Sequence, residues 1–246
     1  MMPLTRRGIE LFRHRIFNPI DRALLTPLLR YKLRRELSVM LRTRQILAGI
    51  DTVAYVDEHL REAEPLASGT AVLQHALSYA AQDGLYLEFG VASGTTINII
   101  ASLAKTTVHG FDSFEGLPED WWGVYKKGTF ASYGRRPKTR KNVELHVGWF
   151  SDVLPPFLEA HREPVAFLHV DSDVYSSAKT VFDNLRDRIR PGCVIVMDEY
   201  FNYPGWRQGE YKAFHEFLTQ TRLGYRYLAY DECGEGVAVI ITEEAK

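Results

Sequence analysis

Cysteine is scarce in this sequence, which has only Cys193 and Cys233 among its 246 residues. Two cysteines are too few for a disulfide-stabilised scaffold or for a zinc site built on thiolates. Cys193 opens an apolar run that indicates a buried strand, where a small thiol packs well. The scarcity favours a reducing compartment, and we expect the protein to be cytoplasmic.

Long hydrophobic runs are absent as well. The sequence has no stretch of about 18 apolar residues, the length that a membrane-spanning helix needs. We therefore expect no transmembrane segment, and we expect no signal peptide because arginines interrupt every early apolar run. These arginines are Arg6, Arg7, Arg13, Arg15 and Arg22.

The whole chain shows no excess of charge of one sign, since its formal net charge is −1, but its basic residues gather near the N-terminus. Residues 1–50 hold 11 Lys and Arg against 3 Asp and Glu, with apolar residues at helical spacing. We predict a basic helical extension over residues 1–65. It could contact a membrane surface peripherally, an anionic partner, the acidic body of its own fold or a second subunit of a homo-oligomer. We expect no nucleic-acid partner.

Internal repeats are missing too, and from residue 85 short apolar strands alternate with helical segments. This alternation predicts parallel strands joined by right-handed crossovers. We expect residues 66–246 to form one doubly wound α/β domain, in which five parallel strands are closed by a pair that includes a reversed edge strand. The predicted strands are 85–89, 108–111, 143–147, 165–170, 193–197, 225–230 and 237–241, and the predicted helices are 51–63, 66–82, 94–104, 150–160, 175–189 and 208–221.

Small residues follow the first strand of this domain, in the stretch LYLEFGVASGTT. Glu88 and Gly90 stand at the strand exit, and Ser93 and Gly94 stand where a helix begins. Glycines allow the backbone to approach a ligand closely, and a helix N-terminus offers unpaired N–H groups. A nucleotide-like ligand is favoured, with a turn needed only for packing as the alternative. The spacing G-x-x-x-G is not the G-x-G-x-x-G of dinucleotide sites, so a pyrophosphate-bearing cofactor is disfavoured.

The next two strands also end in residues that suit a nucleoside. The second strand ends in GFDSFEGLP, where Asp112, followed by Ser113, can accept hydrogen bonds from both ribose hydroxyls. The third ends in HVGWFSD, where Gly148, Trp149 and Phe150 could wall an adenine ring. Three strand ends would then contact one nucleoside, although Asp112 could also be an ordinary surface-turn residue.

Two later strands end in acids. HVDSDVY carries Asp171 and Asp173, and the next strand runs into Asp198 and Glu199. We expect Asp171, Asp198 and Glu199 to converge beside the nucleoside, with Asp171 also contacting it, and to hold a hard cation such as Mg²⁺. Asp173 is the candidate general base for a hydroxyl that the metal activates. The simpler alternative is that Asp173 or Ser176 caps the next helix.

From about residue 85 to 242 the sequence resembles the macrocin O-methyltransferase family of S-adenosylmethionine-dependent enzymes. The resemblance rests on E-F-G-x-x-x-G, G-F-D-S-F-E-G-L-P, G-W-F-x-D-x-L-P, H-V-D-x-D-x-Y-x-S and D-E-Y-F-N-Y-P-G-W. It implies a Rossmann-like class I methyltransferase fold with a seven-stranded, mostly parallel sheet, bound S-adenosylmethionine and a divalent metal, usually Mg²⁺. It further implies methyl transfer to a hydroxyl of a small molecule, often a sugar moiety.

The resemblance also assigns roles to the acids. It implies that Asp171, Asp198 and Glu199 bind the metal and that Asp173 is the base. Many relatives have Asp where this chain has Glu199, so the longer side chain either still binds the metal or leaves the site metal-poor.

Residues 113–142 form an unusually long connection between two predicted strands. Connections of this length are often binding loops, and this one holds seven Lys and Arg against three acids. It could cover a substrate, in which case its charge favours an anionic acceptor, or it could pack as a small subdomain.

Aromatic residues and histidines near these motifs have two interpretations each. The aromatics after the second acid pair could stack on an acceptor ring or form a hydrophobic plug; they are Tyr200, Phe201, Tyr203 and Trp206. His109 and His169 are interpreted as core histidines, and His215 is a second-choice base.

Two other functions remain open from the sequence alone. A Rossmann-type oxidoreductase would bind NAD, but it requires the G-x-G-x-x-G turn that is absent. A non-catalytic nucleoside-binding protein would tolerate alanine at Asp173 and Glu199, whereas an enzyme would lose activity.

Overall fold

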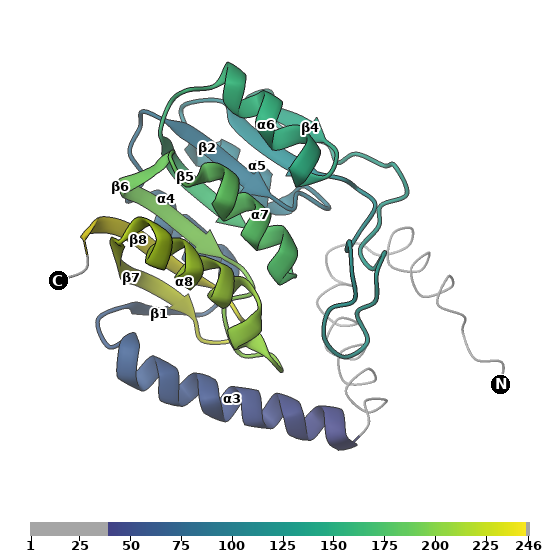
Figure 1. The fold of residues 1–246 in the computed structure, drawn as a ribbon, viewed down its shortest axis with the longest axis vertical. Helices are drawn as coiled ribbons and strands as arrows, with labels where there is room; N and C mark the ends of the chain where they lie inside the picture. The colour runs from purple at the N-terminus through teal and green to yellow at the C-terminus, as the bar shows by residue number, and fades with distance from the viewer. Residues whose placement is uncertain (1–38, 245–246) are drawn as a thin grey trace. The chain divides into compact units, whose positions relative to one another are not determined.

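The structure, a computed structural model, describes residues 39–244. Residues from Leu47 onward form one compact unit, which contains an eight-stranded sheet with helices packed against it (Figure 1). The strands are β1 Glu64–Leu66, β2 Leu85–Phe89, β3 Val108–Asp112, β4 Val143–Val147, β5 Val165–Val170, β6 Ile189–Met197, β7 Leu223–Asp231 and β8 Val237–Glu244. The helices are α3 Val39–His59, α4 Gly69–Leu77, α5 Thr95–Leu103, α6 Phe150–Ala160, α7 Tyr175–Leu185, α8 Glu210–Thr221 and the short 3-10 helix η1 Trp206–Gln208.

The sheet has the strand order β1-β7-β8-β6-β5-β2-β3-β4. Neighbouring strands are parallel except in the pairs β6–β8 and β7–β8, so β8 is the reversed strand. This confirms the mostly parallel, doubly wound α/β fold that the sequence predicts. The reversed strand lies between β6 and β7, and β1 rather than β8 forms the outermost strand at this edge.

The eighth strand, β1, is missing from the prediction because it has only three residues, one of them Pro65. The predicted helix 66–82 is too long for the same reason, since Leu66 belongs to this strand. Helix α4 starts after Ser68, whose backbone is extended and whose Oγ accepts a hydrogen bond from the N–H of Ala71 (3.2 Å). Some other predicted elements, such as β2 and β5, have the predicted bounds, and others have shifted ends; for example, β6 begins at Ile189 instead of residue 193. The predicted helix 51–63 is the last part of the longer helix α3.

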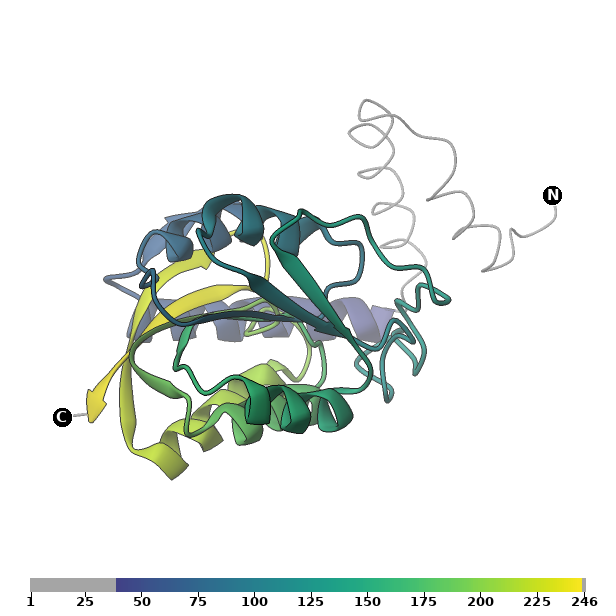
Figure 2. The same cartoon turned by 90° about the horizontal axis from the view of Figure 1, so that it is seen from above.

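Two layers of helices enclose the sheet, with α4 and α5 on one face and α6, α7 and α8 on the other (Figure 2). Successive residues of β5 serve the two layers: Phe167 packs with the α4–α5 layer and Leu168 with the opposite one. Every residue of β2 and β5 is buried. Central parallel strands that are covered on both faces read as continuous apolar runs, which is why these strands were predictable.

Residues 47–65 of the predicted extension belong to the compact unit that contains the sheet. Tyr55 of α3 is 5% exposed, and its hydroxyl forms hydrogen bonds with those of Tyr227 (2.6 Å) and Tyr200 (3.3 Å). Arg207 binds Asp51 of the same helix through both carboxylate oxygens. The helices predicted before residue 39 lie outside the described residues, and the division of the chain at residue 65 stays a prediction. Among residues 39–244, no helix is both long enough and apolar enough to cross a membrane.

Candidate functional site

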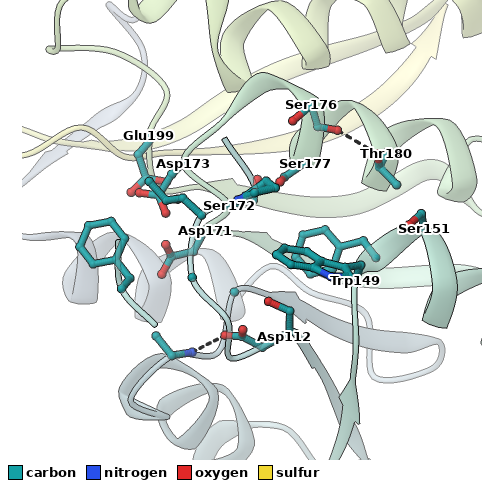
Figure 3. Close-up of a pocket in the computed structure, with 18 residues that line it drawn as sticks. Asp112, Trp149, Ser151, Asp171, Ser172, Asp173, Ser176, Ser177, Thr180 and Glu199 are labelled. Atoms are coloured by element: carbon teal, nitrogen blue, oxygen red, sulfur yellow. Dashed lines mark hydrogen bonds between the residues drawn. The ribbon is translucent and has the colours of Figure 1, made fainter. Parts of the chain in front are cut away.

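A cavity of about 520 Å³ lies beyond the carboxyl ends of the strands in the middle of the sheet (Figure 3). Consecutive loops contribute to its wall: Gly90 after β2, Asp112 at the end of β3, Trp149 after β4, Asp171 after β5 and Glu199 after β6. Parallel strands bring these loops to one edge of the sheet, which is where open α/β sheets bind their ligands.

The turn after β2 is held in place by Gly90 and Asp112. Gly90 has a φ of +96°, and a Cβ at this position would overlap the carbonyl oxygen of Asp171, so only glycine fits. The Oδ2 of Asp112 accepts a hydrogen bond from the N–H of Ala92 (2.7 Å), and its Oδ1 accepts one from the N–H of Phe114 (2.6 Å). Because each carboxylate oxygen has a second lone pair, Asp112 can still accept hydrogen bonds from a ligand in the cavity.

The structure separates the predicted cofactor residues into two groups. Those that line the cavity are Gly90, Asp112, Ser113, Trp149, Phe150 and Asp171. Ser93, Gly94 and Gly148 are close by in sequence but are not among the lining residues. Gly94 has a structural reason, because a Cβ there would meet the ring of Pro137 at 2.7 Å.

Glu88, which we expected to face the ligand, is instead fully buried within β2. Its Oε1 lies 2.9 Å from Nδ1 of His169 on the neighbouring strand β5. This contact confirms the interpretation of His169 as a core histidine. The prediction for Glu88 misses the pairing because the sequence does not reveal that these two side chains face each other across two strands.

Asp171, Asp198 and Glu199 converge as predicted. One carboxylate oxygen from each lies within 4.8 Å of the others, and the Oε2 of Glu199 is buried without a hydrogen-bond partner among the described residues. Burial and the neighbouring charge of Asp198 raise the pKa of Asp171 well above its usual value, and burial and Asp171 do the same for the pKa of Glu199. Carboxylates so arranged would bind a divalent cation with oxygen ligands.

Asp173 lies beside Asp171 and Glu199 and lines the cavity (Figure 3). Its backbone is left-handed, with a φ of +61°. Burial, followed by the charges of Asp198 and Asp112, raises its pKa to about 7. The helix-capping alternative is wrong, because the N-cap of α7 is Val174 with no side-chain cap and Ser176 donates its hydroxyl hydrogen bond to Glu119 instead.

Sequence reasoning missed Glu210, an acid in the first turn of α8 that is completely buried. Its Oε1 accepts hydrogen bonds from the N–H and the hydroxyl of Ser172, both at 3.1 Å, and its Oε2 accepts one from the N–H of Glu199 at 3.3 Å. One carboxylate thus joins the loop after β5 to the loop after β6. Burial raises its pKa to about 8.

The aromatic residues after Glu199 form the predicted hydrophobic plug rather than a stacking surface. All four are at most 2% exposed; they are Tyr200, Phe201, Tyr203 and Trp206. His215 packs among tyrosines, with Nε2 at 3.1 Å from the hydroxyl of Tyr200, and is not among the residues that line the cavity. The geometry therefore gives no support to His215 as a second-choice base.

The long connection 113–142 packs against the fold and also lines the cavity. Trp121 and Trp122 pack their rings against Tyr203, with centroids 5.2 and 6.2 Å away. Leu117 and Phe130 of the same connection line the cavity. The connection is therefore packed onto the plug at one point and forms a wall of the cavity at another.

Comparisons with known proteins agree with this geometry. Residues 87–200 match a family model described as a methyltransferase domain. A tetracenomycin-type rhamnosyl 4′-O-methyltransferase of Streptomyces olivaceus is 29% identical over 107 residues, which make up 36% of this chain and 40% of that protein. A demethyldecarbamoylnovobiocin O-methyltransferase of Streptomyces niveus is 28% identical over 127 residues, or 44% of this chain and 47% of that protein. The matched region spans less than half the length of these curated relatives.

Solved structures give the same fold. A calicheamicin methyltransferase matches with a TM-score of 0.55 and 18% identity, over 96% of this chain and 91% of that one. The O-methyltransferase NovP matches with a TM-score of 0.51 and 19% identity, over 71% of this chain and 78% of that one. The fold of residues 47–244 is therefore the Rossmann-like fold found in these methyltransferases.

Proposed function

We propose that this chain, whose residues 87–200 match the methyltransferase-domain model, is a class I S-adenosylmethionine-dependent methyltransferase that transfers the methyl group of S-adenosylmethionine to a hydroxyl of a small molecule. The observation that carries this proposal is that one cavity combines Asp112, Trp149 and Phe150, which suit a nucleoside, with the acids after β5 and β6. A methyl donor and an activated hydroxyl need to meet within such a space.

The nucleoside part of the cofactor would lie at the ends of β2, β3 and β4. Asp112 would accept hydrogen bonds from the ribose hydroxyls, and Trp149 with Phe150 would wall the adenine. Gly90 would allow the donor to approach the backbone, since no side chain stands there. Asp171 and Asp173, which line the same cavity, would then stand beside the donor.

A divalent cation fits the cluster of Asp171, Asp198 and Glu199. The cluster has only oxygen ligands, and the unpaired, buried Oε2 of Glu199 suggests that the longer side chain is aimed at such an ion. Hard cations such as Mg²⁺ prefer these ligands. When bound, the cation would lower the pKa of an acceptor hydroxyl and hold it in position.

Asp173 would act as the general base. As the hydroxyl oxygen forms its new bond to the methyl carbon, the bond from carbon to sulfur breaks and the hydroxyl proton moves to the carboxylate of Asp173. S-adenosylhomocysteine is the other product. A carboxylate whose pKa lies near 7 is well matched to accept a proton at neutral pH.

The acceptor would be a hydroxyl on a natural product, with a sugar moiety favoured. Both curated relatives are named as O-methyltransferases of natural products, and the name of one includes a rhamnosyl group. The basic connection 113–142, which lines part of the cavity, motivates the further hypothesis that the acceptor is anionic. The cytoplasmic location, the homo-oligomer and the peripheral membrane contact stay predictions from the sequence.

Titration calorimetry with S-adenosylmethionine and S-adenosylhomocysteine, with and without Mg²⁺, tests the proposal. We expect wild-type protein to bind both nucleosides and Asp112→Ala to bind them at least about tenfold more weakly, because a buried hydrogen bond to a charged group is lost. We expect Asp171→Ala to lose magnesium binding. No heat with either nucleoside would contradict the proposal, and NADH binding in a parallel fluorescence titration would favour the oxidoreductase alternative instead.

A further inference from the structure

A second group of metal-binding side chains lies at the edge of the sheet, apart from the cavity. His109 belongs to β3, and Glu144 and His146 belong to the edge strand β4. The parallel register pairs His109 with Glu144, and His146 stands two residues further along β4, so both β4 side chains are on the same face of the sheet. None of the three lines the cavity.

The ligand atoms of these three residues have the spacing of a metal site. All three lie within 4.8 Å of one another. Nδ1 of His109 is 3.2 Å from Nε2 of His146 and 3.7 Å from Oε2 of Glu144. Bonds of about 2.0–2.2 Å to tetrahedral zinc place neighbouring ligand atoms about 3.3–3.6 Å apart, so these side chains need little movement to bind one ion.

The surroundings of the group also favour a cation. The side chain of His109 is 6% exposed and that of Glu144 is 63% exposed, so the group has a buried side and a side that opens to solvent. Phe157 of α6 packs its ring against both imidazoles, at centroid distances of 4.9 and 5.0 Å, and fixes their positions.

We propose that His109, Glu144 and His146 form a second divalent-metal site, which takes Zn²⁺ and leaves its fourth position to water. Two imidazoles and one carboxylate are ligands of borderline cations, whereas the cavity cluster offers only oxygen atoms and suits Mg²⁺. The two sites therefore select different ions. An ion held here ties the edge strand β4 to β3 and so stabilises the fold without taking part in the reaction.

Zinc titration of the full chain in excess Mg²⁺, which fills the cavity cluster, tests this site. We expect saturable binding of Zn²⁺ and a rise in unfolding temperature. We expect His146→Ala and Glu144→Gln to weaken zinc binding by about tenfold or more, since loss of even an outer partner of a metal site costs about 10–100-fold. Both variants should bind S-adenosylmethionine with the affinity of the wild type.

His75→Ala is the matched control, because His75 has a similar carboxylate neighbour, Glu64, at 3.7 Å but belongs to no group of three metal-binding side chains within residues 39–244. This variant should bind zinc as the wild type does. Glu144→Gln keeps the size of an exposed side chain, and its unfolding temperature in EDTA should equal that of the wild type, which shows that the fold is intact. Equal zinc affinity in wild type, His146→Ala and Glu144→Gln overturns the proposal, as does an equal loss in His75→Ala.

Discussion

Asp173 combines a left-handed backbone with a carboxylate whose pKa is raised, and both features cost stability. Such costly features are concentrated at functional sites. Asparagine has nearly the same shape and tolerates the same backbone conformation, but it cannot accept the hydroxyl proton. We expect Asp173→Asn to lower kcat by about 100- to 10,000-fold, the usual contribution of a general base. The affinity for S-adenosylmethionine should stay within about twofold of the wild type.

Steady-state methyl transfer together with calorimetry measures both quantities. Asp187→Asn is the control, because Asp187 is exposed and lies in the turn that follows α7. This variant should keep the wild-type kcat. Full activity of Asp173→Asn would remove Asp173 from the mechanism and would favour a non-catalytic nucleoside-binding protein.

Glu210 positions the acids without lining the cavity itself. Glutamine at this position keeps one oxygen acceptor but has an NH2 group in place of the other. Its side chain therefore cannot accept hydrogen bonds from the N–H groups of both Ser172 and Glu199 as the carboxylate does. We expect Glu210→Gln to weaken magnesium binding by about 10–100-fold while the affinity for S-adenosylmethionine is kept.

Calorimetry with Mg²⁺ and with S-adenosylhomocysteine separates these effects, and the exposed Glu159→Gln on α6 is the control. If Glu210 had a merely structural role, Glu210→Gln would weaken the binding of both ligands equally, or it would lower the unfolding temperature with no change in magnesium affinity.

Some residues of the site could be predicted from the sequence and others could not. Asp171, Asp198 and Glu199 were predictable because the ends of parallel strands must meet at one edge. Glu210 was not, since an acid in the first turn of a helix is ordinarily explained by the helix dipole. The pairing of Glu88 with His169 was not predictable, because the two residues lie 81 positions apart in sequence.

At the scale of elements, the turn after β2 and the loop after β5 lie in direct contact. The N–H of Asp171 donates to the carbonyl oxygen of Phe89 at 2.9 Å, and Gly90 follows with no room for a Cβ. We expect Gly90→Ala to lower the free energy of unfolding by more than about 4 kcal/mol, because the added Cβ forces the backbone to move.

Gly128→Ala separates crowding from backbone strain. Gly128 also has a positive φ, +79°, but within residues 39–244 no heavy atom other than those of its chain neighbours lies within 4 Å of the position of its Cβ. This variant should lose only about 1–2 kcal/mol, the cost of the left-handed conformation. Urea unfolding of both proteins measures the difference, and equal losses would mean that the contact with Asp171 relaxes easily.

The elements that the sequence predicted well are those buried on both sides. β2 and β5 are apolar except for the paired Glu88 and His169, because helices cover both faces of the sheet, and their predicted bounds equal the observed ones. β1 could not be predicted from the sequence, because its three residues, which include Pro65, show neither an alternation of apolar and polar residues nor an apolar run. Its existence depends on pairing with β7, which is a tertiary contact.

At the scale of the whole molecule, a cluster of tyrosines connects α3 to the sheet. The hydroxyl of Tyr227 lies between those of Tyr55 (2.6 Å) and Tyr200 (2.5 Å), and all three side chains are buried. We expect Tyr55→Phe to lower the free energy of unfolding by about 1–3 kcal/mol, because buried hydroxyls lose a partner. Tyr79→Phe, at an exposed position, should change it by less than about 0.5 kcal/mol.

Chemical denaturation followed by two probes, tryptophan fluorescence and circular dichroism, measures this effect. Coincident transitions are expected, since α3 from Leu47 onward and the sheet form one compact unit. A loss in Tyr55→Phe no larger than that in Tyr79→Phe would show that the tyrosine cluster adds nothing to the attachment of α3.

The strand that the sequence failed to reveal also affects how molecules of this protein meet each other. An exposed sheet edge can recruit a strand from another chain, and proteins limit this hazard with short edge strands and prolines. β1 has both properties, because it offers three residues and Pro65 cannot donate a backbone hydrogen bond. At the far edge, β4 presents the exposed charge of Glu144. Both borders of the sheet thus discourage edge-to-edge aggregation at high protein concentration.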